Sequence, residues 1–188
     1  MGVVLTHGAG GNSASPLLVA VADALSEAGA LVIRYDLPFR QKRPSGPPSP
    51  ATGAADRAGI REMALRMRSL VTGPVVMAGQ SYGGRQSSMV AAEEPELAAG
   101  LLLLSYPLHA PGKPGQMRTA HFPSLRARSL FVSGDKDAFG TVDEMKAALA
   151  PIPAEARLIT VRGAGHDLAK GRFDIRGLVV QPLLGMLV

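Results

Sequence analysis

The chain has 188 residues, of which 46% are hydrophobic and 19% charged, with a formal net charge of +5 and no cysteine. This balance is typical of a soluble globular protein, and we expect residues 1–188 to form one domain. Without cysteine there can be no disulfide, no thiolate metal site and no cysteine nucleophile. No apolar run approaches the roughly 18 residues of a membrane helix, and no signal peptide is visible. We therefore expect a cytoplasmic protein with no membrane partner.

The positive charge is concentrated in residues 34–68, which carry eight basic and three acidic side chains and so account for the whole net charge. Nucleic-acid binding is one interpretation of such a segment. However, no nucleic-acid motif accompanies it, and aromatic residues make up only 4% of the chain. We expect a solvated helix face and a basic loop, with no nucleic-acid partner. Arg40, Lys42 and Arg43 could border a pocket and favour an acidic substrate.

Short apolar runs alternate with helical patterns along the chain. The apolar runs predict strands at residues 3–6, 31–35, 75–78, 101–104, 129–132 and 157–161. The apolar periodicity predicts helices at residues 16–28, 54–71, 81–94 and 141–149, and from residue 174 onward. Ser15 and Pro16 are typical of a helix start, Thr141 and Glu144 form a capping-box pattern, and Pro182 is expected to kink the last helix.

Two long connections interrupt this alternation. Residues 38–50 contain five prolines, which predicts a rigid, extended loop at the border of an active site. Residues 105–124 are loop-rich, with a short helix expected near Gln116. Six short strands alternating with helices predict a three-layer α/β/α sandwich around a mostly parallel sheet. In such sheets ligands bind beyond the carboxyl ends of the strands, so the residues that follow each strand are the candidates for function.

The segment GQSYGG at residues 79–84 follows the third predicted strand and opens a helix. This G-x-S-x-G pattern between strand and helix is typical of a nucleophile elbow, in which a strained turn exposes the serine. Gly79 and Gly83 would let neighbouring backbone approach closely. A tight turn with an incidental serine is the alternative. We take Ser81 as the candidate nucleophile.

A serine hydroxyl needs a base, and His166 follows the sixth strand in the segment GAGHD. The alternative for His166 is an ordinary surface histidine. Asp135 and Asp137 both follow the fifth strand, and either could orient the imidazole. The order Ser81, Asp, His166 along the chain is that of the Ser…Asp…His triads known on α/β folds.

The glycine-rich segment HGAGG at residues 7–11 follows the first strand. Backbone N–H groups of Ala9 and Tyr82 are the candidate donors to an oxyanion. We expect His7 to shape this loop rather than transfer protons. A phosphate site is the alternative, but the spacing matches neither of the common glycine-rich phosphate-binding motifs.

Together these motifs resemble the α/β-hydrolase superfamily over nearly the whole chain. They are similar to its small, lid-poor branch of dienelactone-hydrolase-like proteins, which includes testis-expressed protein 30. Further pieces of the resemblance are YDLPF at 35–39, SYPLH at 105–109 and GDKDAFG at 134–140. The superfamily's G-x-x-D pattern after the acid strand implies Asp137, rather than Asp135, as the acid, and its histidine motif supports His166.

The chain departs from this family in two ways. Dienelactone hydrolases usually have a cysteine nucleophile, so their substrate is not implied here. The superfamily sheet has eight strands, whereas this chain opens on what would be the third, which implies an exposed sheet edge. Three interpretations follow: a minimal hydrolase, a misplaced start codon, or an edge covered by a partner, for which a second copy of the chain, forming a homodimer, is a candidate.

The sequence therefore predicts a serine hydrolase that cleaves an ester or thioester of a small acyl substrate through Ser81, His166 and Asp137, with no metal and no cofactor. The alternative is a non-catalytic interaction or scaffold protein of the same fold. His109, at the end of the fourth strand, is a tentative substrate contact. We expect His121 to be structural or on the surface, and Arg85 to be an internal polar anchor.

Overall fold

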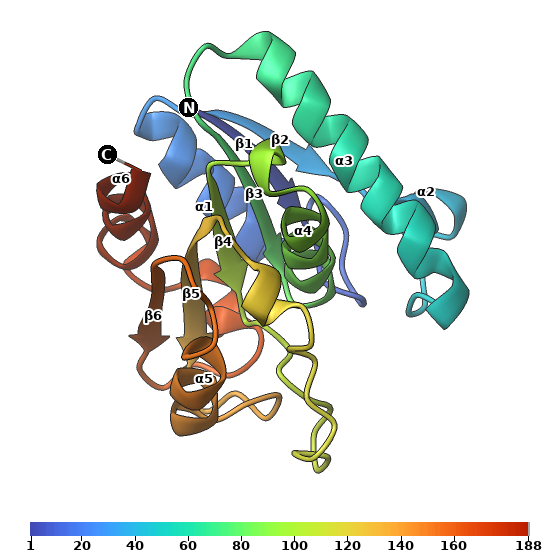
Figure 1. Cartoon of the computed structure of the whole chain (residues 1–188), viewed down its shortest axis with the longest axis vertical. Coiled ribbons are helices and arrows are strands. Elements are labelled where there is room, and N and C mark those ends of the chain that lie inside the picture. Colours follow the sequence, from blue (N-terminus) through green and yellow to red (C-terminus); the bar gives the residue numbers. More distant parts are fainter. Residues whose placement is uncertain (188) are drawn as a thin grey trace.

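The computed structural model describes residues 1–187, and it contains the predicted alternation of strands and helices (Figure 1). The strands are β1 (Gly2–Thr6), β2 (Leu31–Tyr35), β3 (Val75–Gln80), β4 (Gly100–Leu104), β5 (Arg128–Gly134) and β6 (Ala156–Val161). The α-helices are α1 (Pro16–Glu27), α2 (Pro38–Lys42), α3 (Gly53–Leu70), α4 (Tyr82–Glu93), α5 (Val142–Leu149) and α6 (Gln181–Leu187). Short 3₁₀ turns are η1 (Pro50–Thr52), η2 (Pro95–Leu97), η3 (Phe122–Ser124) and η4 (Leu168–Gly171), and η5 (Arg176–Val180) is a π-helical turn.

The six strands form one sheet in the order β2-β1-β3-β4-β5-β6, and every neighbouring pair is parallel. The predicted α/β sheet is therefore confirmed. After β2 the chain crosses back over β1, so the strand order reverses between β1 and β3, which is where open α/β sheets bind ligands. Thr6 is paired with Gly79, and Gly79 with Leu103. This register starts the loops after β1, β3 and β4 side by side.

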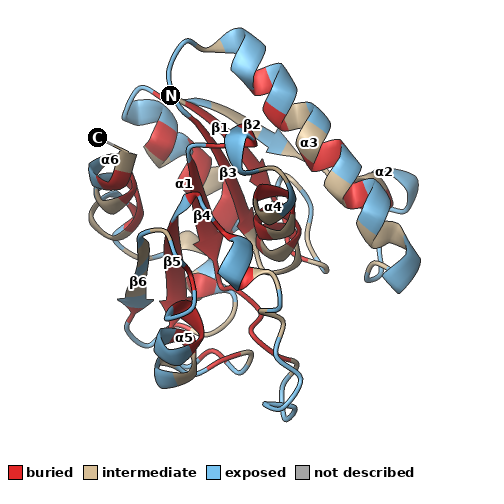
Figure 2. Ribbon diagram, in the orientation of Figure 1, coloured by how far each residue is buried: buried red, intermediate tan, exposed pale blue. Residues whose placement is uncertain are grey.

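Two apolar layers cover the sheet. In β1, Val3 and Leu5 pack with α1 and the C-terminal helix, whereas Val4 points to the opposite face, against α3. The side chains of β1, β3 and β4 are almost wholly buried, but the edge strands β2 and β6 carry exposed residues (Figure 2). Leu31 of β2 is 44% exposed, so the expected sheet edge is open on this side. That a second copy covers it stays a prediction.

The basic helix α3 is partly neutralised by α4. Arg57 and Arg61 form ion pairs with Glu93, and Arg61 also contacts Glu94. Solvent reaches both partners of each pair, so each adds little to stability, and the pairs fit a solvated helix face. No helix within residues 1–187 is both long and apolar enough to cross a membrane.

Three local expectations need correction. Residues 38–42 are helical rather than extended, because Pro38 occupies the first helical turn and the next proline comes only at residue 44. Residues around Gln116 form turns instead of a helix, since Pro111, Pro114 and neighbouring glycines interrupt them. The C-terminal helix forms, but its irregularity is the π-helical turn before Pro182, whose missing N–H breaks the regular hydrogen-bond pattern.

Candidate active site

Ser81 has the strained backbone expected of a nucleophile elbow. Its φ is +48° and its ψ is −114°, outside the range that most residues adopt. The Ser81 N–H donates to the carbonyl of Leu104 at 2.8 Å, and the Gly83 N–H donates to the carbonyl of His7. A Cβ on Gly83 would lie 2.5 Å from that His7 oxygen, so the turn has no room for a larger residue there. The loops after β1, β3 and β4 thus hold the serine in place.

The structure brings Ser81, His166 and Asp137 together. His166 Nε2 lies 2.8 Å from Ser81 Oγ, and His166 Nδ1 lies 2.8 and 2.9 Å from the two Asp137 oxygens. With the Nδ1–H donating to the carboxylate, Nε2 is left to accept the serine proton. The Asp137 side chain is only 2% exposed, and its Oδ1 also accepts from the Phe139 N–H. This geometry is that of a nucleophile, a base and an orienting acid.

Asp135, the other candidate acid, binds a backbone N–H of the loop after β6 instead of the His166 ring. Its Oδ1 accepts a 2.7 Å hydrogen bond from the Gly163 N–H, three residues before the candidate base. It therefore ties the loop after β6 to the loop after β5. Phe139 stacks on the His166 ring with centroids 4.0 Å apart, which further limits rotation of the imidazole. Asp137, not Asp135, contacts His166.

The two predicted oxyanion donors come from different segments: Ala9 lies in the loop after β1, and Tyr82 is the first residue of α4, directly after Ser81. Within residues 1–187, the backbone N–H groups of Ala9 and Tyr82 donate to no other residue. His7 supports the loop after β1 through two hydrogen bonds. Its Nε2 accepts from the Leu37 N–H, and its Nδ1–H donates to the Gly8 carbonyl. Burial lowers the pKa of His7, which favours the neutral ring that these bonds require.

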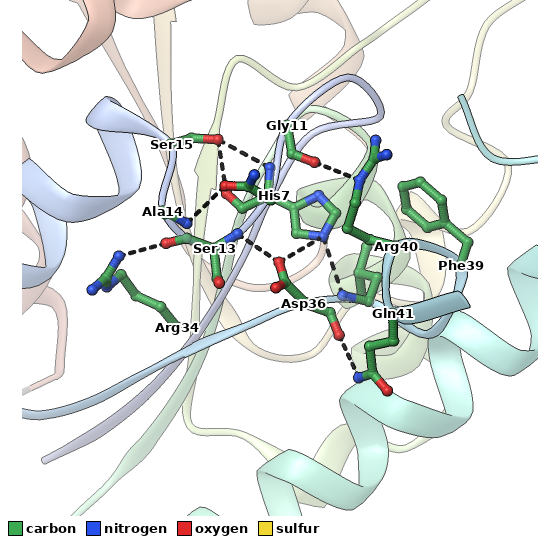
Figure 3. Close-up of polar contacts among 12 residues, drawn as sticks. His7, Gly11, Ser13, Ala14, Ser15, Arg34, Asp36, Phe39, Arg40 and Gln41 are labelled. Carbon is green, nitrogen blue, oxygen red and sulfur yellow. Dashed lines mark hydrogen bonds and ion pairs between the residues drawn. The ribbon is translucent and has the colours of Figure 1, made fainter. Parts of the chain in front are cut away.

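Arg40 also supports the loop after β1, a role that the sequence analysis missed. Its guanidinium donates to the Gly11 carbonyl at 2.8 Å (Figure 3). It also donates to the Ala9 carbonyl at 2.8 Å, and Arg40 is 6% exposed. Asp36 completes this support, because its carboxylate accepts from the Ser13 N–H (Figure 3). The expectation that Arg40 borders the pocket is wrong, because its donors are used on backbone oxygens.

Asp56 is a second missed residue. Its fully buried carboxylate accepts from the Tyr82 hydroxyl at 2.6 Å and from the Phe39 N–H at 3.0 Å. These bonds join α3 to α2 and to the residue that supplies one candidate oxyanion donor. A buried carboxylate is rare without partners, but nothing in the local pattern of α3 distinguishes Asp56 from a surface acid.

A cavity of about 730 Å³ opens above Ser81 and His166. The loop after β1 lines it, together with residues 47–50, Phe139, Arg85 and Arg118. The prediction that the proline-rich loop borders the site is therefore confirmed for its last four residues. Within residues 1–187, no group of three or more His, Asp or Glu side chains could hold a metal ion.

The other two histidines lie outside the cavity lining. His109 is nearly buried, donates from Nδ1 to the Ala110 carbonyl and lies 3.4 Å from a Glu144 oxygen. The structure thus places it against α5 rather than against a substrate. His121 donates from Nε2 to Ser88 Oγ at 2.8 Å, as expected of a structural residue.

The half-buried position of His121 predicts a dependence of stability on pH. Burial, with the charge of Arg85, lowers the pKa of His121 to about 4, whereas the unfolded ring titrates near 6.5. Between these values the unfolded chain binds more protons, so stability is full above pH 6.5 and falls as the pH drops toward 4. We expect a loss of about 1 kcal/mol between pH 7 and pH 5, less than the full linkage because water reaches part of the ring.

Urea unfolding of the wild type and of His121→Gln at both pH values measures this loss. Because the pKa of His7 is lowered in both proteins, the difference between them isolates His121. The variant should lose less stability than the wild type. Equal losses would show that His121 does not titrate in this window.

The comparison with known families gives one clear match. A family model described as an alpha/beta hydrolase domain matches residues 1–175. This span includes all six strands and the three residues Ser81, Asp137 and His166.

Solved structures share the fold at low sequence identity. An alpha-beta serine hydrolase homologue from Coxiella burnetii has a TM-score of 0.74 and 21% identity, covering 97% of this chain and 85% of its own. Est1E from Butyrivibrio proteoclasticus, solved with ferulic acid bound, has a TM-score of 0.76 and 19% identity, covering 99% and 89%. XC6422 from Xanthomonas campestris, described as an a/b serine hydrolase without lid, has a TM-score of 0.73 and 20% identity, covering 97% and 81%.

Proposed function

Because the chain belongs to the α/β-hydrolase family, we propose that it is a serine hydrolase that cleaves an ester or thioester bond of a small acyl substrate. One observation carries the proposal: the chain of contacts from Ser81 Oγ through the His166 ring to the buried Asp137 carboxylate. The finer branch of dienelactone-hydrolase-like proteins, and a cytoplasmic location, stay predictions.

In this proposal Ser81 Oγ attacks the acyl carbonyl while His166 Nε2 takes the hydroxyl proton. Asp137 keeps the Nδ1 proton in place and stabilises the imidazolium that forms. The oxyanion accepts from the Ala9 and Tyr82 N–H groups. His166 then gives its proton to the leaving group, and water, activated by the same base, hydrolyses the acyl-enzyme.

The shape of the cavity favours a small substrate. The loop after β1 and residues 47–50 both line it, and within residues 1–187 no inserted helical domain covers it. A lidless arrangement is also described for XC6422. We favour esters and thioesters over amides because no separate element within residues 1–187 would bind a peptide on either side of Ser81.

A panel of p-nitrophenyl esters of graded chain length tests the proposal. The wild type should release p-nitrophenol with saturation kinetics, and the rate should fall for acyl chains too long for a cavity of about 730 Å³. If no ester of the panel is hydrolysed above the rate in buffer, the alternative of a non-catalytic interaction protein is favoured. Thioesters of the same acids then separate the two bond types.

Arg40 provides a test of the oxyanion loop. Replacing Arg40 with Met removes the donors to Ala9 and Gly11, so the loop should shift by a fraction of an ångström or more. Because misplacement on this scale lowers rates strongly, we expect kcat to fall by about 10- to 100-fold with little change in KM.

The matched control is Arg43→Met. Arg43 is an exposed arginine at the C-terminal end of α2, three residues after Arg40, and its guanidinium donates only to the Pro47 carbonyl. It should have a much smaller effect on kcat. A smaller fraction of folded protein would lower the total activity of a variant. Rates are therefore divided by the concentration of reactive sites, measured by active-site titration, so that kcat refers to folded enzyme alone. Equal kcat values for the two variants would contradict the positioning role of Arg40.

A further inference from the structure

Two arginines, Arg85 and Arg118, lie in the wall of the catalytic cavity. Arg85 belongs to the first turn of α4, and its backbone N–H donates to the Ser81 carbonyl at 2.9 Å. Arg118 ends the long loop that follows β4. Both line the cavity, whereas none of its lining residues is an Asp or Glu. Two positive charges therefore face one small space without a compensating charge.

Arg85 differs from the other arginines near the sheet. Its Nε is buried without a hydrogen-bond partner, and within residues 1–187 it forms no ion pair. By contrast, Arg57 and Arg61 are paired with glutamates of α4. A guanidinium group without hydrogen-bond partners is costly to bury, and because Arg85 lines the cavity a ligand can reach the part of this group that faces the open space. Arg85 is therefore more than the internal polar anchor that the sequence suggested.

Arg118 is fixed through its backbone, and its side chain is left free. The Tyr106 hydroxyl donates to the Arg118 carbonyl at 2.6 Å, and the Arg118 N–H donates to the Leu108 carbonyl at 2.8 Å. Its guanidinium makes no hydrogen bond or ion pair within the described part of the chain. Burial, and secondly the nearby charge of Arg85, lower the pKa of Arg118, as expected of two guanidinium groups that line one cavity.

We propose that Arg85 and Arg118 bind a carboxylate carried by the substrate, so that the preferred substrate is a monoester of a short dicarboxylic acid. Guanidinium groups present planar, paired donors that match a carboxylate, and such bonds are strongest in a partly desolvated site. Arg85 lies one helical turn from Ser81, which places the anion a few bonds from the ester carbonyl. The proposal rests on the hydrolase function proposed above.

Matched esters test this specificity. Monomethyl succinate, glutarate and adipate are each compared with the neutral methyl ester in which a methyl group replaces the carboxylate. The wild type should have a kcat/KM about 10- to 100-fold higher for the acid of best length than for its neutral partner. Arg118→Gln and Arg85→Gln should each reduce this ratio toward one. Because the readout is a ratio, loss of folded protein does not imitate the effect.

The control is Lys113→Gln, which removes one positive charge from an exposed position of the loop that carries Arg118. It should leave the ratio at the wild-type value, since this residue does not line the cavity. A ratio that falls equally in Lys113→Gln and Arg118→Gln would mean that general positive charge, and not this pair, attracts the acid. That result would overturn the proposal.

A binding experiment separates this proposal from the hydrolase function. Calorimetric titration of Ser81→Ala with monomethyl adipate and methyl hexanoate, and with the shorter pairs, needs no turnover. One acid should bind at least about 10-fold more tightly than its neutral partner, and Arg118→Gln in the same background should remove the difference. Equal affinities would overturn the carboxylate site even in an active esterase. A selective acid site in an inactive protein would instead overturn only the hydrolase proposal.

Discussion

Replacing Ser81 with alanine should lower the kcat of ester hydrolysis by about 10⁴-fold or more. The variant has no nucleophile for an acyl-enzyme, and His166 Nε2 loses the hydroxyl that lies 2.8 Å away. The strained φ of Ser81 is also available to alanine only at a cost, but the hydrogen bonds of the Ser81 and Gly83 N–H groups do not depend on the side chain. We therefore expect the variant to fold and to remain inactive.

The measurement is the steady-state hydrolysis of the best ester, with Ser69→Ala as a control. Ser69 lies near the end of α3 and does not line the cavity, and its hydroxyl donates only to the Arg66 carbonyl. The control should retain wild-type kcat. If Ser81→Ala keeps more than a tenth of wild-type activity, the nucleophile is another residue.

Replacing Asp137 with asparagine should lower kcat by about 10²- to 10⁴-fold. The amide is nearly isosteric, but it no longer carries the charge that stabilises the imidazolium. Its NH₂ group also favours the tautomer in which Nδ1 accepts a hydrogen bond from the amide and Nε2 carries the ring proton, so Nε2 cannot act as the base. Because Asp137 is buried and also accepts from the Phe139 N–H, the effect should appear in kcat and in a shifted pH–rate profile.

Asp135→Asn provides the matched comparison, since both residues lie in the same loop after β5. Asp135 accepts from the Gly163 N–H and does not contact His166, so its replacement should lower kcat by about 10-fold or less. A larger loss for Asp135→Asn than for Asp137→Asn would reverse the assignment of the acid.

The sequence predicts the sheet well because its strands are short, wholly apolar runs that only a doubly covered sheet can bury. Residues 101–104, four successive leucines, illustrate this: all four are fully buried in β4. The capping box at Thr141 and Glu144 is present as predicted, because both of its hydrogen bonds lie within one turn of helix. Local chemistry of this kind can be read from spacing alone.

The position of Ser81 is likewise predictable, whereas the tasks of Asp135 and Asp137 are not. Both carboxylates follow β5 within three residues, and only the fold of the loop after β6 determines which one faces His166. Family resemblance implied Asp137, but the spacing of residues left both open.

The support of the oxyanion loop could not be predicted for the same reason. Arg40 contacts Ala9 across 31 residues and Asp56 contacts Tyr82 across 26, and each reads as a surface residue in its own segment. The cavity that Arg85 lines is formed in part by the loop that carries Arg118, and the sequence of this loop has no periodic pattern. Long-range polar contacts thus account for most of what the sequence analysis missed.

Covalent labelling tests the central claim most directly. The wild type is treated with a fluorophosphonate, digested, and mapped by peptide mass spectrometry, with Ser81→Ala treated in parallel. An adduct on Ser81, absent from the variant and lost on prior unfolding, is the predicted result, because only a serine activated by His166 reacts readily. No adduct in the folded wild type, or an adduct on another serine that persists in Ser81→Ala, would contradict the proposed hydrolase mechanism.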